Sequence, residues 1–153
     1  MFRATLKRRV DADAVKRAIE EAEGRTSGEI RVSVSTFFWG NVRRTAERAF
    51  TRLGMNQTAQ RNGILFFVVP SRRAFVVLGD EGIHAKVGQE FWDAVAAAVS
   101  ARFKAGDFTG GLVHGISEAG RQLAAHFPSQ GLQDRNELPD AVVFERGSRW
   151  PGP

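Results

Sequence analysis

Cysteine is absent from the 153-residue chain, which excludes disulfide bonds, thiolate zinc sites and a cysteine nucleophile. No apolar run approaches the roughly 20 residues that a transmembrane helix needs. The first nine residues are basic and lack the apolar core of a secretory signal. We therefore expect a soluble, cytoplasmic protein without a membrane span.

Tyrosine is also absent, and the other aromatic residues have the spacing of core residues instead of alternating with basic ones. This pattern disfavours nucleic-acid binding. The formal net charge of +5 and the pI near 10.6 nevertheless keep one alternative open. A basic N-terminal arm (residues 1–10) and a stripe formed by Arg44, Arg48 and Arg52 could bind nucleic acid or another anionic surface.

Hydrophobic periodicity predicts alternating helices and strands. The predicted helices are those of residues 11–24, 41–53, 88–103 and 112–127. The predicted strands are those of residues 29–35, 63–69 and 74–78, with a short edge strand at 141–144. The first strand alternates apolar and polar residues, which indicates a half-buried strand. The second is continuously apolar, which is typical of a strand buried on both faces.

The order of these elements predicts an α/β fold with a small mixed β-sheet flanked by helices on both faces. The helix between the first two strands predicts a right-handed parallel β-α-β unit. The turn at residues 70–73 predicts an antiparallel hairpin strand after the second strand. We expect one domain over residues 11–128, preceded by the basic arm and followed by a loosely packed tail (residues 129–153).

Strand direction brings polar residues to one end of this sheet. The first two strands begin there, and the antiparallel third strand ends there. Glu29, Asn62, Asp80 and Glu81 should therefore lie near one another. Their carboxylate and amide oxygens are the ligands that Ca²⁺ and Mg²⁺ prefer, so we predict a divalent-cation site. The alternative is a solvated turn, because Asp and Gly are common turn residues.

Three further features have two interpretations each. His84 is either an acid-base group or metal ligand, or an ordinary surface histidine. Asp107 is either a fifth metal ligand or the cap of the final helix. The aromatic residues 37–39 form either part of the core or an exposed patch for a partner.

Several short motifs occur together in a characteristic order. They are SGEI at 27–30, RNGIL at 61–65, GDEGI at 79–83, FKAGDF at 103–108, AHFP at 125–128 and NELP at 136–139. In this combination the chain resembles the TPM domain family of thylakoid-lumen, photosystem-repair and receptor-auxiliary proteins, in its short soluble bacterial branch. The sequence departs from the family at Asp80, where many members carry an aromatic residue. It also has residues 86–88 (Lys-Val-Gly) where members often have an acidic residue.

The resemblance implies a βαββαα core, binding of calcium or another divalent cation, and the acid phosphatase activity suggested for plant members. We expect an accessory or interaction module that acts with a protein partner, for example in the assembly or repair of membrane proteins, and binds Ca²⁺ or Mg²⁺ at the acidic sheet end. A metal-dependent acid phosphatase is the alternative. It is the weaker one, because the arginine stripe should face solvent and leaves no assigned cation to hold a phosphate.

Overall fold

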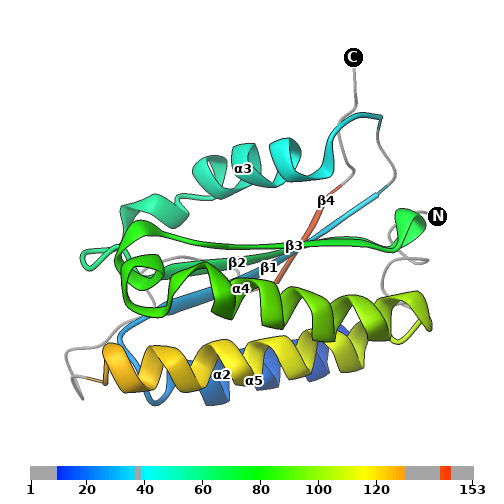
Figure 1. Cartoon of the computed structure of the whole chain (residues 1–153). Helices are drawn as coiled ribbons and strands as arrows, with labels where there is room; N and C mark the ends of the chain where they lie inside the picture. The colour runs from blue at the N-terminus through cyan, green and yellow to red at the C-terminus, as the bar shows by residue number, and fades with distance from the viewer. Residues whose placement is uncertain (1–9, 37–38, 130–141, 146–153) are drawn as a thin grey trace.

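A four-stranded sheet separates one helix from three others in the computed structural model, which describes residues 10–36, 39–129 and 142–145. The strands are β1 (Glu29–Ser35), β2 (Gly63–Val69), β3 (Ala74–Gly79) and β4 (Val142–Glu145). The helices are α2 (Ala12–Glu23), α3 (Val42–Arg52), α4 (Glu81–Lys104) and α5 (Phe108–His126), with short 3₁₀ turns at Met55–Gln57 and Pro70–Arg72. Helix α3 covers one face of the sheet, and α2, α4 and α5 cover the other (Figure 1). The predicted α/β fold class is confirmed.

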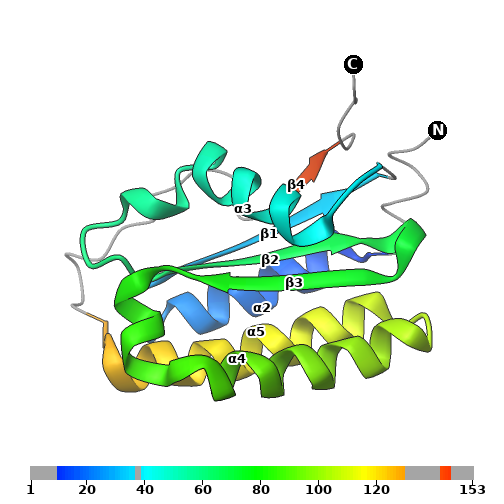
Figure 2. The same cartoon turned by 45° about the horizontal axis from the view of Figure 1, so that its top comes forward.

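The strand order is β3-β2-β1-β4, so β3 and β4 are the edge strands (Figure 2). Strand β1 runs parallel to β2, with Ile30 opposite Ile64. Strand β3 runs antiparallel to β2, with Val77 opposite Phe66. These pairings are the parallel β-α-β unit and the hairpin that the sequence predicts.

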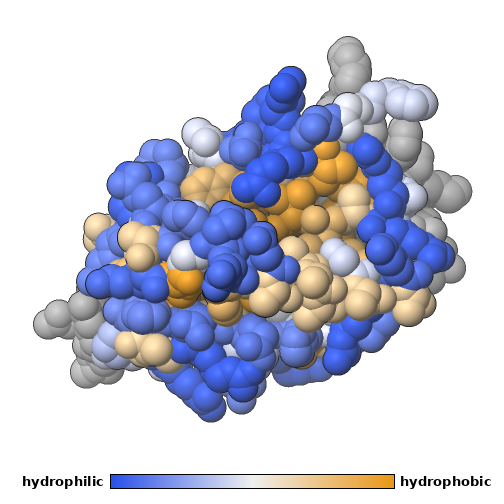
Figure 3. Space-filling view, in the orientation of Figure 1, coloured by the Kyte–Doolittle hydropathy of each residue, from blue (hydrophilic) through white to orange (hydrophobic). Residues whose placement is uncertain are grey.

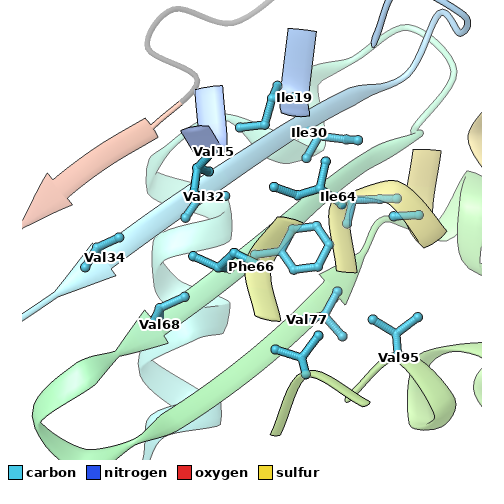
Figure 4. Packing of buried hydrophobic residues seen from close by; sticks show 14 of the residues in the cluster. Val15, Ile19, Ile30, Val32, Val34, Ile64, Phe66, Val68, Val77 and Val95 are labelled. Atoms are coloured by element: carbon cyan, nitrogen blue, oxygen red, sulfur yellow. The ribbon is translucent and has the colours of Figure 1, made fainter. Parts of the chain in front are cut away.

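Two hydrophobic clusters, one on each face, hold the sheet between its helices. On the larger face, Val32, Ile64 and Phe66 belong to a cluster with apolar residues of α2, α4 and α5, and their side chains gather on that side of the strands (Figure 4). On the other face, Leu65 and Phe67 belong to a cluster that includes Ala46 and Ala49 of α3. Strand β2 is therefore buried on both faces, as its continuous apolar run predicts.

The prediction that β1 is half-buried is wrong, because all seven of its residues are buried. The buried residues include Glu29 and Arg31, each 4% exposed, and the fully buried Ser33. Strand β1 pairs with β2 on one side and with β4 on the other. It therefore has a strand partner at both edges, and the residues on both of its faces are buried, whereas simple alternation predicts a solvated polar face.

The helices begin at polar N-cap residues. Asp11 caps α2, Asn41 caps α3 and Asp107 caps α5, each accepting a hydrogen bond from a backbone N–H in the first turn. Helix α4 starts at Glu81 rather than at residue 88, because Asp80 caps it. Gly88, with φ 77° and ψ 170°, interrupts the helical conformation inside this element, and glycine tolerates that conformation.

Strand β4 lies within the segment predicted as a tail. It pairs in parallel with β1, with Val142 opposite Val32, and it corresponds to the edge strand predicted at 141–144. Residues 1–9 of the predicted arm, and residues 130–141 and 146–153 of the predicted tail, lie outside the described residues. No helix in the described ranges has the length and apolar character needed to cross a bilayer.

Candidate functional site

The beginnings of β1 and β2 and the end of β3 meet at one end of the sheet, as strand direction predicts. Glu29 lies opposite Gly63 in the β1–β2 register. The Asp80 N–H donates to the Gly63 carbonyl oxygen over 2.9 Å, directly after β3. The polar residues predicted for a cation site therefore come from adjoining strand ends, with the exception of Asp107.

Asp80 forms a two-point ion pair with Arg61. Arg61 Nε lies 2.6 Å from Asp80 Oδ2, and Arg61 Nη2 lies 2.9 Å from Asp80 Oδ1. The carboxylate is only 6% exposed and also accepts a hydrogen bond from the Glu81 N–H. The hydrogen bond to Asp80 is the main reason that the pKa of Arg61 lies above its ordinary value. Both carboxylate oxygens of this buried predicted ligand thus already have a cationic partner.

At Gly82, next to this ion pair, two backbone segments approach each other closely because glycine has no side chain. The Arg61 carbonyl oxygen accepts hydrogen bonds from the N–H groups of Gly82 (2.8 Å) and Ile83 (3.3 Å). A Cβ at position 82 would lie 2.3 Å from the Gln60 carbonyl oxygen. Arg61 itself has a left-handed backbone, with φ 51°. The loop before β2 and the start of α4 are therefore held together by backbone hydrogen bonds as well as by the ion pair between Arg61 and Asp80.

Glu81 and Asn62 have different surroundings from Asp80. Glu81 is 74% exposed and lies 3.5 Å from Arg61 Nη2. Asn62 is 1% exposed, and its Nδ2 donates to Ser27 Oγ (3.3 Å) and Gln60 Oε1 (3.4 Å). Its Oδ1 atom is buried and has no hydrogen-bond partner. This acceptor is a buried polar atom that a ligand could satisfy.

Asp107 lies at the opposite end of the sheet from Asp80. Asp80 caps the start of helix α4, and the helix ends at Lys104, whose carbonyl oxygen accepts a hydrogen bond from Arg73 in the β2–β3 turn. Asp107 Oδ1 accepts a hydrogen bond from the Gly110 N–H over 2.9 Å, and Oδ2 lies 3.8 Å from Arg102 Nη1. Its observed role is the helix cap, which is one of the two interpretations that its sequence position allows.

No group of three or more His, Cys, Asp or Glu side chains is placed to hold a metal ion in residues 10–36, 39–129 and 142–145. Of the other sequence candidates, His84 accepts a hydrogen bond at Nδ1 from Trp92 Nε1 over 2.9 Å. Trp39 in the predicted aromatic loop is 80% exposed, whereas Phe37 and Phe38 lie outside the described residues.

Glu23 is a functional-group candidate that the sequence analysis missed. Its Oε2 atom accepts a hydrogen bond from the Ile30 N–H over 2.7 Å, which joins the end of α2 to β1. Burial is the largest influence on this carboxyl group and raises its pKa from 4.5 to about 7, against the opposing effects of the Ile30 hydrogen bond and Arg31. The helical pattern of residues 11–24 does not predict that the side chain of this glutamate is buried.

A groove of about 340 Å³ runs along the outer edge of β3, between α3 and α4. Residues 75–79 of β3 form its floor, Arg43 of α3 lines one wall, and Trp92, Asp93 and other residues of α4 line the opposite wall. Figure 3 shows hydrophobic surface in this hollow, bordered by the hydrophilic surface of α3. We call it the β3 groove.

The backbone of β3 has hydrogen-bonding groups that point into this groove. Because Asp80 N–H donates to Gly63, the alternation of an antiparallel pair directs the backbone groups of residues 74, 76 and 78 toward β2. The groups of Phe75, Val77 and Gly79 then point outward. Among the residues that the structure describes, no strand pairs with this edge. The sequence predicts the hairpin, but nothing in it specified that β3 would be an edge strand.

A second hollow of about 400 Å³ lies between α2 and α5. Its lining consists mainly of small residues, including Ala18, Ala22 and Gly120, and a Cβ at Gly120 would lie 2.7 Å from the Ala22 Cβ. This hollow marks the close packing of two helices. Glu21, Arg25 and Arg121 also line it, but it offers no edge strand, so the β3 groove is the better candidate for binding an extended segment.

Comparison with known proteins identifies the family of this protein. The sequence profile of the TPM domain matches residues 4–122. The BA42 protein from the psychrophilic bacterium Bizionia argentinensis is 38% identical, with a TM-score of 0.79 over 90% of this chain and 93% of that one. The N-terminal domain of cg2496 from Corynebacterium glutamicum, 14% identical, shares only the fold, with a TM-score of 0.59 over 87% of this chain and 77% of that one. No curated protein matches the chain. The profile match and the likeness to BA42 together show that this chain belongs to the TPM domain family.

Proposed function

We propose that the protein is an accessory interaction module that binds an extended segment of a partner protein in the β3 groove. The observation that carries the proposal is the outward-pointing backbone of Phe75, Val77 and Gly79 at the floor of a groove. An edge strand with unpaired N–H and C=O groups is a template for a further strand. Peptide recognition by strand addition uses such an edge for affinity and the neighbouring side chains for specificity.

The dimensions of the groove suit a short peptide strand. The floor extends over five residues of β3, which at roughly 3.4 Å per residue corresponds to about 14 Å between the first and last Cα atoms. The volume of about 340 Å³ is within the range of roughly 300–1,000 Å³ that is common for ligand sites. Gly79 has no side chain to block the edge, and Trp92 packs over it: a Cβ there would lie 2.2 Å from the indole ring.

Selection from a random peptide library, followed by NMR mapping, tests this function. Selected peptides should shift the backbone amide signals of Phe75, Val77 and Gly79 more than those of β4 at the opposite edge. Peptides that bind but shift other regions would contradict the proposal, and so would the absence of any selected peptide.

The proposed compartment for this activity is the cytoplasm, as expected for a chain without cysteine.

A divalent cation at the acidic sheet end is a second proposal, favoured by the buried, unpartnered Oδ1 of Asn62. Asn62 and the exposed Glu81 would be its first ligands. Asp80 could join them only by exchanging Arg61 for the cation, because Arg61 contacts both of its carboxylate oxygens. Glu29 is a further candidate, buried at the start of β1. Calcium is the cation first expected, with magnesium as the alternative.

Thermal unfolding tests the cation proposal. Millimolar Ca²⁺ or Mg²⁺ should raise the Tm of the wild-type protein, because a ligand that binds only the folded state stabilises it. The rise should disappear when Asp80→Ala and Glu81→Ala are combined. The variant Asp107→Asn, at the other end of the sheet, should keep it. A wild-type Tm that is the same with and without metal would contradict the proposal.

The alternative of a metal-dependent phosphatase stays a prediction. Arg44, Arg48 and Arg52 are exposed on α3, as the sequence predicts. The cation nearest the acidic sheet end, Arg61, is already engaged with Asp80. Hydrolysis of a generic phosphate ester that is lost in the Asp80→Ala, Glu81→Ala double variant would support this alternative.

A further inference from the structure

We infer that the segment bound in the β3 groove is a strand in which apolar and acidic residues alternate. This inference rests on the proposed function and adds the chemistry of the partner. An added strand continues the pleat of the sheet, so its successive side chains point to opposite faces. One set would lie on the side of α4 and the other on the side of α3.

The α4 side of the groove favours apolar residues. Phe75 and Val77 direct their side chains to this face, where both belong to or pack against the larger core cluster. Trp92 and Ala96 of α4 line the same side. Asp93 also lines the groove there and would repel a carboxylate on this face. An aliphatic residue of the added strand on this face would cover the partly exposed side chains of Phe75 and Ala96.

The α3 side favours acidic residues. Arg43 lines the groove and is exposed, with Glu47 3.5 Å away as its ion-pair partner. Helix α3 carries four arginines (Arg43, Arg44, Arg48 and Arg52) and a single acidic residue, Glu47. A carboxylate of the added strand on this face would therefore lie in a positive field. Complementary charge of this kind speeds association and selects among partners.

A second copy of this chain is a poorer occupant on charge grounds. Two β3 edges that join around a twofold axis perpendicular to the sheet would place both α3 helices on the same face. Arg43 of one copy would then approach the cationic α3 of the other, and like charges across an interface oppose association. The charge of α3 thus favours a foreign acidic strand over self-association.

The experiment compares three synthetic peptides of equal length by fluorescence anisotropy. One alternates Val and Glu, the second alternates Val and Lys, and the third contains the Val and Glu residues of the first in two separate blocks. The alternating Val-Glu peptide should bind at least about tenfold more tightly than the other two. Backbone N-methylation of one alternate set of its residues should abolish binding, whereas methylation of the other set should not. The amide signals of Phe75, Val77 and Gly79 should report the contact.

Two surface variants test the acidic preference. Arg43→Glu should reduce the advantage of Val-Glu over Val-Lys at least about fivefold or reverse it, because the wall of the groove changes sign. Arg44→Glu makes the same charge change on the same helix at a residue that does not line the groove, so it should have a much smaller effect. An equal effect of the two variants would overturn the inference, since it would indicate only the general field of the protein.

The outcomes separate this inference from the proposed function. If Val-Glu and Val-Lys peptides bind β3 equally and both depend on one methylation pattern, strand addition stands and the acidic preference is overturned. If none of the peptides shifts the β3 amides and the library yields no binder, the proposed function fails as well. If sedimentation shows dimers whose formation shifts these amides, the occupant is a second copy and the inference is overturned.

Discussion

The guanidinium group of Arg61 contacts both carboxylate oxygens of Asp80, with Nε 2.6 Å from Oδ2 and Nη2 2.9 Å from Oδ1. This pair joins the loop before β2 to the N-terminus of α4. Asp80 also caps that helix through the Glu81 N–H. One carboxylate therefore neutralises a cation, starts a helix and occupies the centre of the predicted cation site.

Arg61→Ala should lower the Tm by several degrees, because it leaves the nearly buried Asp80 carboxylate without its cationic partner. Asp80→Asn should be milder, since asparagine is also a good helix cap and the charge that loses its partner, Arg61, is 42% exposed to water. Glu81→Gln is the matched control, because Glu81 is 74% exposed. Thermal unfolding followed by circular dichroism measures all three. A Tm change for Arg61→Ala no greater than that for Glu81→Gln would show that the pair contributes little.

Gly82→Ala should destabilise the protein by about 2 kcal/mol or more. The added Cβ would lie 2.3 Å from the Gln60 carbonyl oxygen and 2.5 Å from that of Arg61, and overpacking against backbone forces the chain to move. Gly24→Ala is the control, since its Cβ would have contacts of 3.5 Å or longer and its φ of −63° suits alanine. That change should be neutral or slightly stabilising. Urea unfolding of both variants measures the difference, and equal free energies of unfolding would contradict the expected clash.

The strands were predictable because their patterns are local. The run GILFFVV at 63–69 is continuously apolar, and only a strand covered on both faces accommodates such a run. The helix cap at Asp107 was predictable too, as one of the two interpretations of that residue. The convergence of Glu29, Asn62 and Asp80 at one sheet end followed from strand direction alone.

The features that sequence could not supply depend on non-local contacts. The polar face of β1 is buried, with Ser33 opposite Phe67 on the side of the sheet that α3 covers, and the pattern within one strand does not show what packs over it. Arg61 pairs with Asp80 from a left-handed backbone conformation, and hydrophobic periodicity does not predict such a conformation at a non-glycine residue. The β3 groove exists because the strand order leaves β3 at an edge of the sheet. Hydrophobic alternation predicts strands but not their order in the sheet.

Asp107→Ala should lower the free energy of unfolding by about 1 kcal/mol, as expected for the loss of a helix cap. Asp107→Asn should change it by much less, because the asparagine side chain can accept the same hydrogen bond from the Gly110 N–H. Urea unfolding without added metal measures both variants. If instead Asp107→Asn lost as much stability as Asp107→Ala, the charge of Asp107 rather than its cap would matter at this helix.

The carboxyl group of Glu23 should make stability fall as the pH rises from about 4.5 to about 7. Burial raises the pKa of Glu23 in the folded protein to about 7, from an ordinary value of 4.5. Between these values the folded state binds a proton that the unfolded state has released, so raising the pH favours unfolding. The shift corresponds to at most about 3 kcal/mol.

Glu23→Gln retains an acceptor for the Ile30 N–H without titrating, so the variant should equal the wild type near pH 4 and exceed its stability at pH 8. Glu21→Gln, an exposed change on the same helix that is not among the groups shifting the pKa of Glu23, should leave the pH dependence as it is. Urea unfolding at a series of pH values measures these curves, and parallel curves for Glu23→Gln and the wild type would show that Glu23 titrates no differently in the folded and unfolded states.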